Sequence, residues 1–283
     1  MTRRLVWLFD VDGTLIRTYG AAREAFQEAA RVLLGVDEAL EDVPFAGRTD
    51  PLILGDILRK HGRRLGAAET ARFWHIVRTR MQAVLETGRG QVLPGVVPLL
   101  GAIAREPAWV PALLTGNTAA MARLKLGHFG LADAFVFGAF GDDAPDRDAM
   151  ARIAVTQARE RWGVPPGRCV VVGDTELDIQ CARAAEAKVV AVATGVRTRA
   201  ELESHAPDLM LDDLSDTGCS SMFTVELWRS LPPASNSPTS TVSGWVLSTT
   251  GVVNFSVPWN FELLTSTWLV VEPVARTLSP SFT

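Results

Sequence analysis

Short apolar runs that end in polar turn residues recur along this chain. The first covers residues 5–9 and is followed directly by Asp-Val-Asp-Gly-Thr. Similar runs cover residues 109–114, 169–172 and 188–193, and a weaker one covers residues 134–137. Runs of this length that stop at turn residues are typical of strands buried on both faces of a parallel sheet.

Helical patterns lie between these runs, at residues 118–129, 147–161 and 177–186. Strands that alternate with helices indicate βαβ units, so the sequence predicts an α/β fold with a doubly wound, Rossmann-like parallel sheet. Ligands of such sheets bind at the carboxyl ends of the strands. The polar residues that follow the apolar runs are therefore the candidates for a functional site.

The alternation is interrupted between residues 19 and 90. Residues 21–34 and 67–85 have the apolar spacing of amphipathic helices and are rich in Ala, Arg, Glu and Leu. No strand pattern is visible in this span. The sequence therefore predicts an all-helical cap domain, residues 19–90, inserted into a catalytic core made of residues 1–18 and 91–217.

The composition changes near residue 218. Residues 218–283 contain two Arg, no Lys, three Glu and 21 Ser or Thr, and every Asp of the chain lies before them. Residues 245–271 are apolar enough for short strands, but polar residues and a proline interrupt them, so a transmembrane helix is not expected. We expect this Ser/Thr-rich tail to lie outside the catalytic fold.

The charge and the cysteines exclude several classes of protein. A formal net charge of −4 over 283 residues gives no general attraction to nucleic acid or to an anionic membrane, so neither partner is expected. The three cysteines, Cys169, Cys181 and Cys219, form neither a disulfide framework nor a metal-ligand cluster. The apolar run at residues 5–9 is shorter than the core of a signal peptide. These features favour a cytoplasmic protein that binds any anionic ligand through local positive charge.

Asp10 and Asp12 stand at the end of the first predicted strand, and Gly13 permits a tight turn away from it. Two residues after Asp10, Asp12 can point back toward the same site. One carboxylate can attack phosphorus while the other handles the proton of the leaving group, and carboxylates are known phosphoryl acceptors. This pattern predicts phosphoryl-transfer chemistry.

Two further clusters follow later strands. Thr115, Gly116 and Asn117 open a helix, where a hydroxyl and free N–H groups form an anion site, although Thr and Asn are also common as ordinary helix caps. Asp174 ends another strand and Asp178 lies one helical turn later, so their hard oxygens suit Mg²⁺. The alternative is an acidic helix start that complements the helix dipole.

A cation must also hold the transferring phosphoryl group. Lys125 lies ten residues after Thr115, which places it roughly 12–15 Å from the strand end at about 1.5 Å per helical residue. Arg147 starts a helix directly after the loop at residues 141–146, on the catalytic side of the sheet. The sequence therefore favours Arg147 over Lys125. The acidic residues of the loop are expected to be turn and cap residues: Asp142, Asp143 and Asp146.

The motifs Asp-x-Asp-Gly-Thr, Thr-Gly-Asn, a basic residue and Gly-Asp-Thr-x-x-Asp, in this order, resemble the pattern of the haloacid dehalogenase superfamily. The resemblance covers residues 5 to about 214, and the helical insertion is similar to the family's C1-type cap. It implies that Asp10 is the nucleophile of a phospho-aspartate mechanism and Asp12 the general acid/base. It also implies that Thr115 binds the phosphoryl group, which the basic residue neutralises. The family usually has a lysine where Arg147 is chosen here, and the arginine keeps the charge.

The resemblance further implies a magnesium site formed by Asp10, the backbone carbonyl of Asp12, and Asp174, with Asp178 in support. Gly47-Arg48-Thr49-Asp50, residues 122–126 and Thr194-Gly195 look like phosphoglycolate-phosphatase-type members. This similarity implies a small phosphorylated metabolite as substrate, and a homodimer is a possible assembly. Arg48 can then reach the substrate from the cap, or it is a solvated structural arginine.

Several other functions remain open at this stage. A sugar phosphomutase uses the same aspartate pair and cap, and a phosphonatase would need a Schiff-base lysine in the cap, where Lys60 is the one lysine. A haloacid dehalogenase is disfavoured, because its chemistry has no oxygen leaving group for Asp12 to protonate. A catalytically silent binding protein is the alternative of another class, and the retention of all the acidic motif residues argues against it.

Overall fold

The computed structural model describes residues 4–215, 241–248 and 251–258. The chain divides into two compact units, Met1–Pro232 and Pro233–Thr283. In the second unit, β9 (Thr241–Ser248) and β10 (Gly251–Pro258) form an antiparallel hairpin, in agreement with the short strands expected there. The predicted start of the tail, near residue 218, lies outside the described residues.

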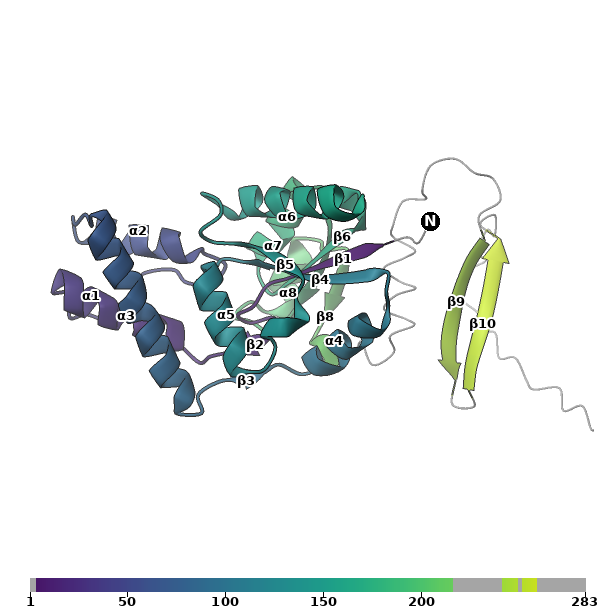
Figure 1. Cartoon of the computed structure of the whole chain (residues 1–283), viewed down its shortest axis with the longest axis horizontal. Helices are drawn as coiled ribbons and strands as arrows, with labels where there is room; N and C mark the ends of the chain where they lie inside the picture. Colours follow the sequence, from purple (N-terminus) through teal and green to yellow (C-terminus); the bar gives the residue numbers. More distant parts are fainter. Residues whose placement is uncertain (1–3, 216–240, 249–250, 259–283) are drawn as a thin grey trace, which may run out of the picture. The chain divides into compact units, whose positions relative to one another are not determined.

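A six-stranded parallel sheet forms the centre of the first unit (Figure 1), as the strand and helix alternation predicts. The strands lie in the order β5-β4-β1-β6-β7-β8. Their bounds are β1 (Leu5–Phe9), β4 (Trp109–Thr115), β5 (Phe137–Phe140), β6 (Cys169–Gly173), β7 (Lys188–Val192) and β8 (Leu209–Leu211).

The winding of the sheet reverses beside β1. The chain adds β4 and β5 on one side of β1, and then adds β6, β7 and β8 on the other side. A reversal of this kind leaves a crevice at the carboxyl ends of the strands, where α/β proteins bind ligands. Asp10 follows β1 at this point, with the loops after β4 and β6 on either side of it.

Both faces of the sheet are buried, which explains the uninterrupted apolar sequence of β1. Leu5, Trp7 and Phe9 face one apolar cluster, which α4 (Val96–Arg105) and α5 (Ala119–His128) complete. Val6 and Leu8 face the opposite cluster, built with α6 (Arg147–Trp162), α7 (Glu176–Ala184) and α8 (Arg199–Ser204). Figure 1 shows α6 and α4 on opposite sides of the sheet.

Three helices form the insertion expected between residues 19 and 90: α1 (Ala21–Leu34), α2 (Asp50–Lys60) and α3 (Ala67–Glu86). They share an apolar cluster of their own, into which α5 of the core contributes Met121. The chain leaves the core along β2 (Ile16–Arg17) and returns along β3 (Gln91–Val92), which pair antiparallel. The predicted α/β core with an all-helical cap is therefore confirmed.

The structure differs from the sequence expectations at several elements. The weak strand expected at residues 134–137 is β5 at Phe137–Phe140, because Ala132–Ala134 form a 3₁₀ turn first. Helices α2 and α4 and strand β8 were not predicted. Proline and glycine interrupt the helical pattern of α4, but its proline lies in the first turn, where the missing N–H costs little. Within the described residues, no helix has both the length and the apolar character needed to cross a bilayer.

Candidate active site

Three buried carboxylates meet at the carboxyl ends of β1 and β6. Asp10 follows β1, Asp174 follows β6, and Asp178 lies in the first turn of α7. One ligand oxygen from each lies within 4.8 Å of the others. Asp174 also accepts a hydrogen bond of 3.2 Å from the Thr14 hydroxyl. Hard oxygens grouped in this way suit a divalent cation such as Mg²⁺.

The charges of this cluster are not balanced by the protein alone. Burial raises the pKa of Asp10 to about 7, and the charges of Asp178 and Asp12 add to the rise, while the attraction of Arg147 opposes it. Burial, followed by the charges of Asp10 and Asp178, also raises the pKa of Asp174 well above its ordinary value. A bound cation would offset the repulsion that adds to both shifts. The donor set therefore fits the magnesium ion implied by the sequence motifs.

The absence of side chains at Gly13 and Gly195 makes room for the Asp174 carboxylate. A Cβ atom at Gly13 would lie 2.4 Å from Asp174 Oδ2, and Gly13 also has a positive φ of 87° that favours glycine. A Cβ atom at Gly195 would lie 1.6 Å from the same oxygen. Any side chain at either position would displace the carboxylate from the cluster.

Arg147 lies in the site, as the sequence indicates. Its Nη2 is 3.8 Å from Asp10 Oδ1 and forms an ion pair with Asp178 Oδ1. Burial by itself would lower the pKa of Arg147, but the charges of Asp178 and Asp10 raise it. The buried Nε has no hydrogen-bond partner among the described residues. Arg147 therefore offsets part of the negative charge of the carboxylate cluster.

Lys125 also lies in the site, so the distance argument that set it aside is wrong. Its Nζ donates to Asp12 Oδ2 at 2.6 Å and to Asn117 Oδ1 at 2.7 Å, and the residue is 1% exposed. The sequence argument followed the helix axis alone. It ignored the length of the lysine side chain and its direction, because long side chains on a helix point back toward the N-terminus.

Asn117 connects the loop after β4 to this lysine. Its Nδ2 donates to Asp12 Oδ2 at 2.8 Å and to the Thr115 hydroxyl at 2.9 Å. Thr115 is fully buried at the end of β4. The Asp12 side chain, by contrast, remains 38% exposed. Asp12 is therefore held by two neighbours on one side and open to an incoming molecule on the other.

A cavity of about 470 Å³ opens above these residues and is lined by both the core and the cap. Arg48 lines it, but its guanidinium already forms an ion pair with Asp56 of α2. Gly116 lines it as well and lies against the cap, because a Cβ atom there would be 2.3 Å from the Arg48 carbonyl oxygen. The loop that the sequence predicts to bind substrate is therefore in direct contact with the cap.

The acidic residues of the loop after β5 accept hydrogen bonds from backbone amides, as expected of turn and cap residues. Asp142 accepts from Ala119 N at 3.0 Å, and Asp146 accepts from Ala149 N at 2.8 Å and caps α6. Asp143 accepts from Phe140 N at 2.8 Å. Lys60, the cap lysine, lies at the end of α2 and pairs with Glu38 and Asp42 instead of lining the cavity.

Sequence reasoning assigned no role to three polar residues at the site. Thr14 donates to Asp174, and Thr194 donates to the Gly13 carbonyl oxygen at 2.5 Å. Asp50 of the cap accepts from Thr118 N at 2.7 Å and is buried. All three belong to motifs that the sequence displays, but each acts through a contact with a distant segment that no spacing rule reveals.

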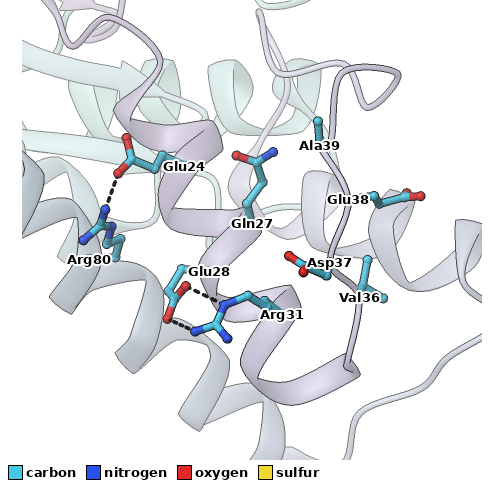
Figure 2. Close-up of a pocket in the computed structure, with 9 residues that line it drawn as sticks. All are labelled: Glu24, Gln27, Glu28, Arg31, Val36, Asp37, Glu38, Ala39 and Arg80. Atoms are coloured by element: carbon cyan, nitrogen blue, oxygen red, sulfur yellow. Dashed lines mark hydrogen bonds and ion pairs between the residues drawn. The ribbon is translucent and has the colours of Figure 1, made fainter.

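A second hollow, of about 290 Å³, lies on the outside of the cap between α1 and the segment that follows it (Figure 2). The arginines that line it are already paired. Figure 2 shows Arg31 bonded to Glu28 and Arg80 bonded to Glu24. With Asp37 and Glu38 also present, carboxylates outnumber the cations there. This excess of negative charge disfavours an anionic ligand in the second hollow, and the cavity above Asp10 is the candidate active site.

Comparisons with solved structures find the same fold in several enzymes. A predicted phosphoglycolate phosphatase from Haemophilus somnus matches with a TM-score of 0.60 and 19% identity, over 80% of this chain and 99% of that one. A β-phosphoglucomutase from Clostridium difficile matches with a TM-score of 0.64 and 18% identity, over 80% and 98%. CbbY from Rhodobacter sphaeroides, solved in complex with phosphate, matches with a TM-score of 0.62 and 25% identity, over 77% and 97%.

Sequence comparisons identify the family of the chain. No curated protein matches the chain. The sequence profile of the haloacid dehalogenase-like hydrolases matches residues 6–186, which include β1, the cap and the acidic motif after β6. Since this match spans most of the described fold and all of the carboxylate cluster, the chain belongs to the haloacid dehalogenase-like hydrolases.

Proposed function

We propose that this chain is a magnesium-dependent phosphatase that hydrolyses a small phosphorylated metabolite through a phospho-aspartate on Asp10. The observation that carries the proposal is the position of Asp10. Its carboxylate belongs to a cluster that suits a divalent cation, and it lines the same cavity as the side chain of Asp12. A phosphoryl acceptor beside a proton donor is the arrangement that phosphomonoester hydrolysis requires.

In the first half of the reaction, a carboxylate oxygen of Asp10 attacks phosphorus and the bond from phosphorus to the leaving oxygen breaks. Asp12 gives its proton to that oxygen, so the alcohol leaves uncharged. In the second half, Asp12 takes a proton from water as the water oxygen attacks the phosphoryl group. Inorganic phosphate leaves and the Asp10 carboxylate is restored.

The remaining residues hold the groups in place. Asp10, Asp174 and the main-chain carbonyl of Asp12 would hold the magnesium ion, with Asp178 supporting them through its bond to Thr175. When bound, the ion would offset negative charge on the phosphoryl oxygens. Thr115 and Gly116, which line the cavity at the end of β4, bind the phosphoryl group.

The two buried cations have different tasks in this proposal. Arg147 lies near Asp10 and lines the cavity, so it neutralises the transferring phosphoryl group. Lys125 contacts Asp12 and Asn117, so it orients the proton donor. The solved CbbY structure with phosphate supports phosphate as a ligand of this fold. The cavity of about 470 Å³ suits a small substrate, which Arg48 would reach from the cap.

The test is hydrolysis of an aryl phosphate by the full chain with Mg²⁺, compared with Asp10→Asn. We expect no turnover from the variant, and we expect acid-quenched wild type to carry a phosphoryl group on the peptide that contains Asp10. Asp133→Asn makes the same chemical change at an exposed position and should retain activity. Turnover by Asp10→Asn would overturn the covalent mechanism.

A panel of phosphorylated metabolites then separates the phosphatase from the other enzymes of its fold. Release of inorganic phosphate supports hydrolysis, whereas interconversion of sugar phosphate isomers without release would identify a mutase. Binding without turnover across the panel would favour the silent binding protein. The pairing of Lys60 with Glu38 and Asp42 already argues against a phosphonatase, which needs a free lysine at the site.

A further inference from the structure

Residue 50 of the cap contacts the phosphate-binding loop on both sides of Asn117. Its main-chain N–H donates to the Gly116 carbonyl oxygen at 2.7 Å, and its Oδ2 accepts from Thr118 N, also at 2.7 Å. Thr118 is the N-cap residue of α5, which carries Lys125. One cap residue therefore fixes the backbone before and after the asparagine that binds Asp12.

The fit between this cap segment and the loop is close. A Cβ atom at Gly116 would lie 2.3 Å from the Arg48 carbonyl oxygen, so the loop packs directly on the cap backbone. On the far side of the loop, Gly141 N donates to the Asn117 carbonyl oxygen at 2.8 Å. The loop is held between the cap and the core, and the cap side of this arrangement depends on residue 50.

The surroundings of Asp50 link it to the catalytic groups. Asp50 is 6% exposed. Burial raises the pKa of Asp50 to about 6, the charge of Lys125 and the bond from Thr118 N oppose the rise, and the charge of Asp12 adds to it. Cap opening would return this carboxylate to water and remove the acceptor of Thr118 N.

We propose that Asp50 is a positioning residue that fastens the cap to the phosphate-binding loop, so that Asn117 and Lys125 are aligned on Asp12 only while the cap is closed. This inference rests on the proposed phosphatase function. It assigns the cap a part in assembling the proton donor, in addition to covering the cavity. Hydrolysis in the open state is then slow, because the group that activates water is out of place.

The experiment compares wild type with Asp50→Ala, Asp50→Asn and Asp42→Asn. Asp42→Asn removes a cap carboxylate that is exposed and pairs with Lys60, so it is the control for loss of charge. Hydrogen exchange of the backbone amides at residues 116–124 and at the linker 87–90 is measured without substrate. Turnover of an aryl phosphate is measured in parallel.

In Asp50→Ala we expect faster exchange at both segments and a fall in kcat of about 10–100-fold with little change in KM, the effect of a misplaced catalytic group. Asp50→Asn keeps an oxygen that can accept from Thr118 N, so it should restore most of the protection and activity. If Asp50→Ala does not fold, Asp50→Ser carries the same measurements, since its side chain is too short to keep the bond.

Unchanged exchange and unchanged kcat in Asp50→Ala would overturn the proposal. So would a loss in Asp50→Asn as large as that in Asp50→Ala, because the charge and not the hydrogen bond would then be responsible. If wild type has no phosphatase activity, the proposed function fails. In that case the exchange measurement alone decides whether Asp50 fastens the cap.

Discussion

Replacing Asp10 by Asn should stabilise the metal-free protein while it abolishes turnover. The pKa of Asp10 rises from 3.8 to about 7 because the folded protein disfavours its charge. At about 1.36 kcal/mol per pKa unit, this rise from 3.8 to about 7 corresponds to about 4 kcal/mol of lost stability at pH 8, where the group is ionised in both states. Asparagine keeps the shape without the charge, so the variant should recover much of this free energy.

The dependence on pH has a definite sign. A group whose pKa is higher in the folded state contributes stability at low pH and loses it as the pH rises through the folded value. The contribution of Asp10 should therefore be largest below pH 3.8 and should be lost by pH 8. In wild type without metal, the part of the unfolding free energy due to Asp10 should fall by about 1 kcal/mol between pH 6 and pH 8. The raised pKa of Asp174 acts in the same direction.

Thermal unfolding in EDTA at pH 6 and pH 8, for wild type and for Asp10→Asn, measures these quantities. For a chain of this size about 4 kcal/mol corresponds to roughly 10 °C in Tm, so the gain of Asp10→Asn over wild type should be plain at pH 8 and smaller at pH 6. Mg²⁺ should stabilise wild type more than the variant. A variant less stable than wild type in EDTA at pH 8 would refute the claim that the buried charge is destabilising.

Three further changes test other parts of the site and the fold. Lys125→Met should lower kcat about 10²-fold, with a larger loss for alkyl than for aryl phosphates because Asp12 is the proton donor. Lys188→Met is the control, since Lys188 forms an exposed ion pair with Asp208. Equal losses on both substrates would contradict the role of Lys125 in orienting Asp12. EDTA should remove activity and Mg²⁺ should restore it. Ca²⁺ should not restore it, since Ca²⁺ prefers more ligands at longer distances. Full turnover in chelator would contradict the dependence on magnesium. Removal of residues 218–283 should leave turnover and the melting transition nearly unchanged, and an aggregated product would place part of the tail in the fold.

The sequence predicts the fold well wherever burial alone decides the structure. The strands β1, β4, β6 and β7 are buried on both faces, so their apolar runs are unmistakable. Edge strand β8 is three residues long and only half buried, so its sequence carries too little signal. The shift of β5 has a similar cause, because the apolar residues before it are used in a 3₁₀ turn.

The site is harder to predict, because its contacts join segments that are far apart in the chain. The carboxylates could be found, since Asp10 and Asp174 directly follow strands, Asp178 lies in the next helical turn, and the sheet brings strand ends together. The place of Lys125 depends on the direction of a long side chain from the middle of α5, which backbone spacing does not describe. The contact of Asp50 with Thr118 depends on how the cap packs against the core, and no local pattern encodes it.

The pairing of β2 with β3 makes the cap a separable module. Ile16 pairs with Val92 and Arg17 with Gln91, so the insertion starts and ends on neighbouring residues. Opposed residues of an antiparallel pair lie about 5 Å apart, and a two-residue turn is enough to join them. Recombination could therefore exchange the whole span between them for another domain without disturbing the six-stranded sheet. Such an exchange must also replace the contacts of the cap with the core: Met121 of α5 packs among cap residues, and Asp50 bonds to the loop after β4.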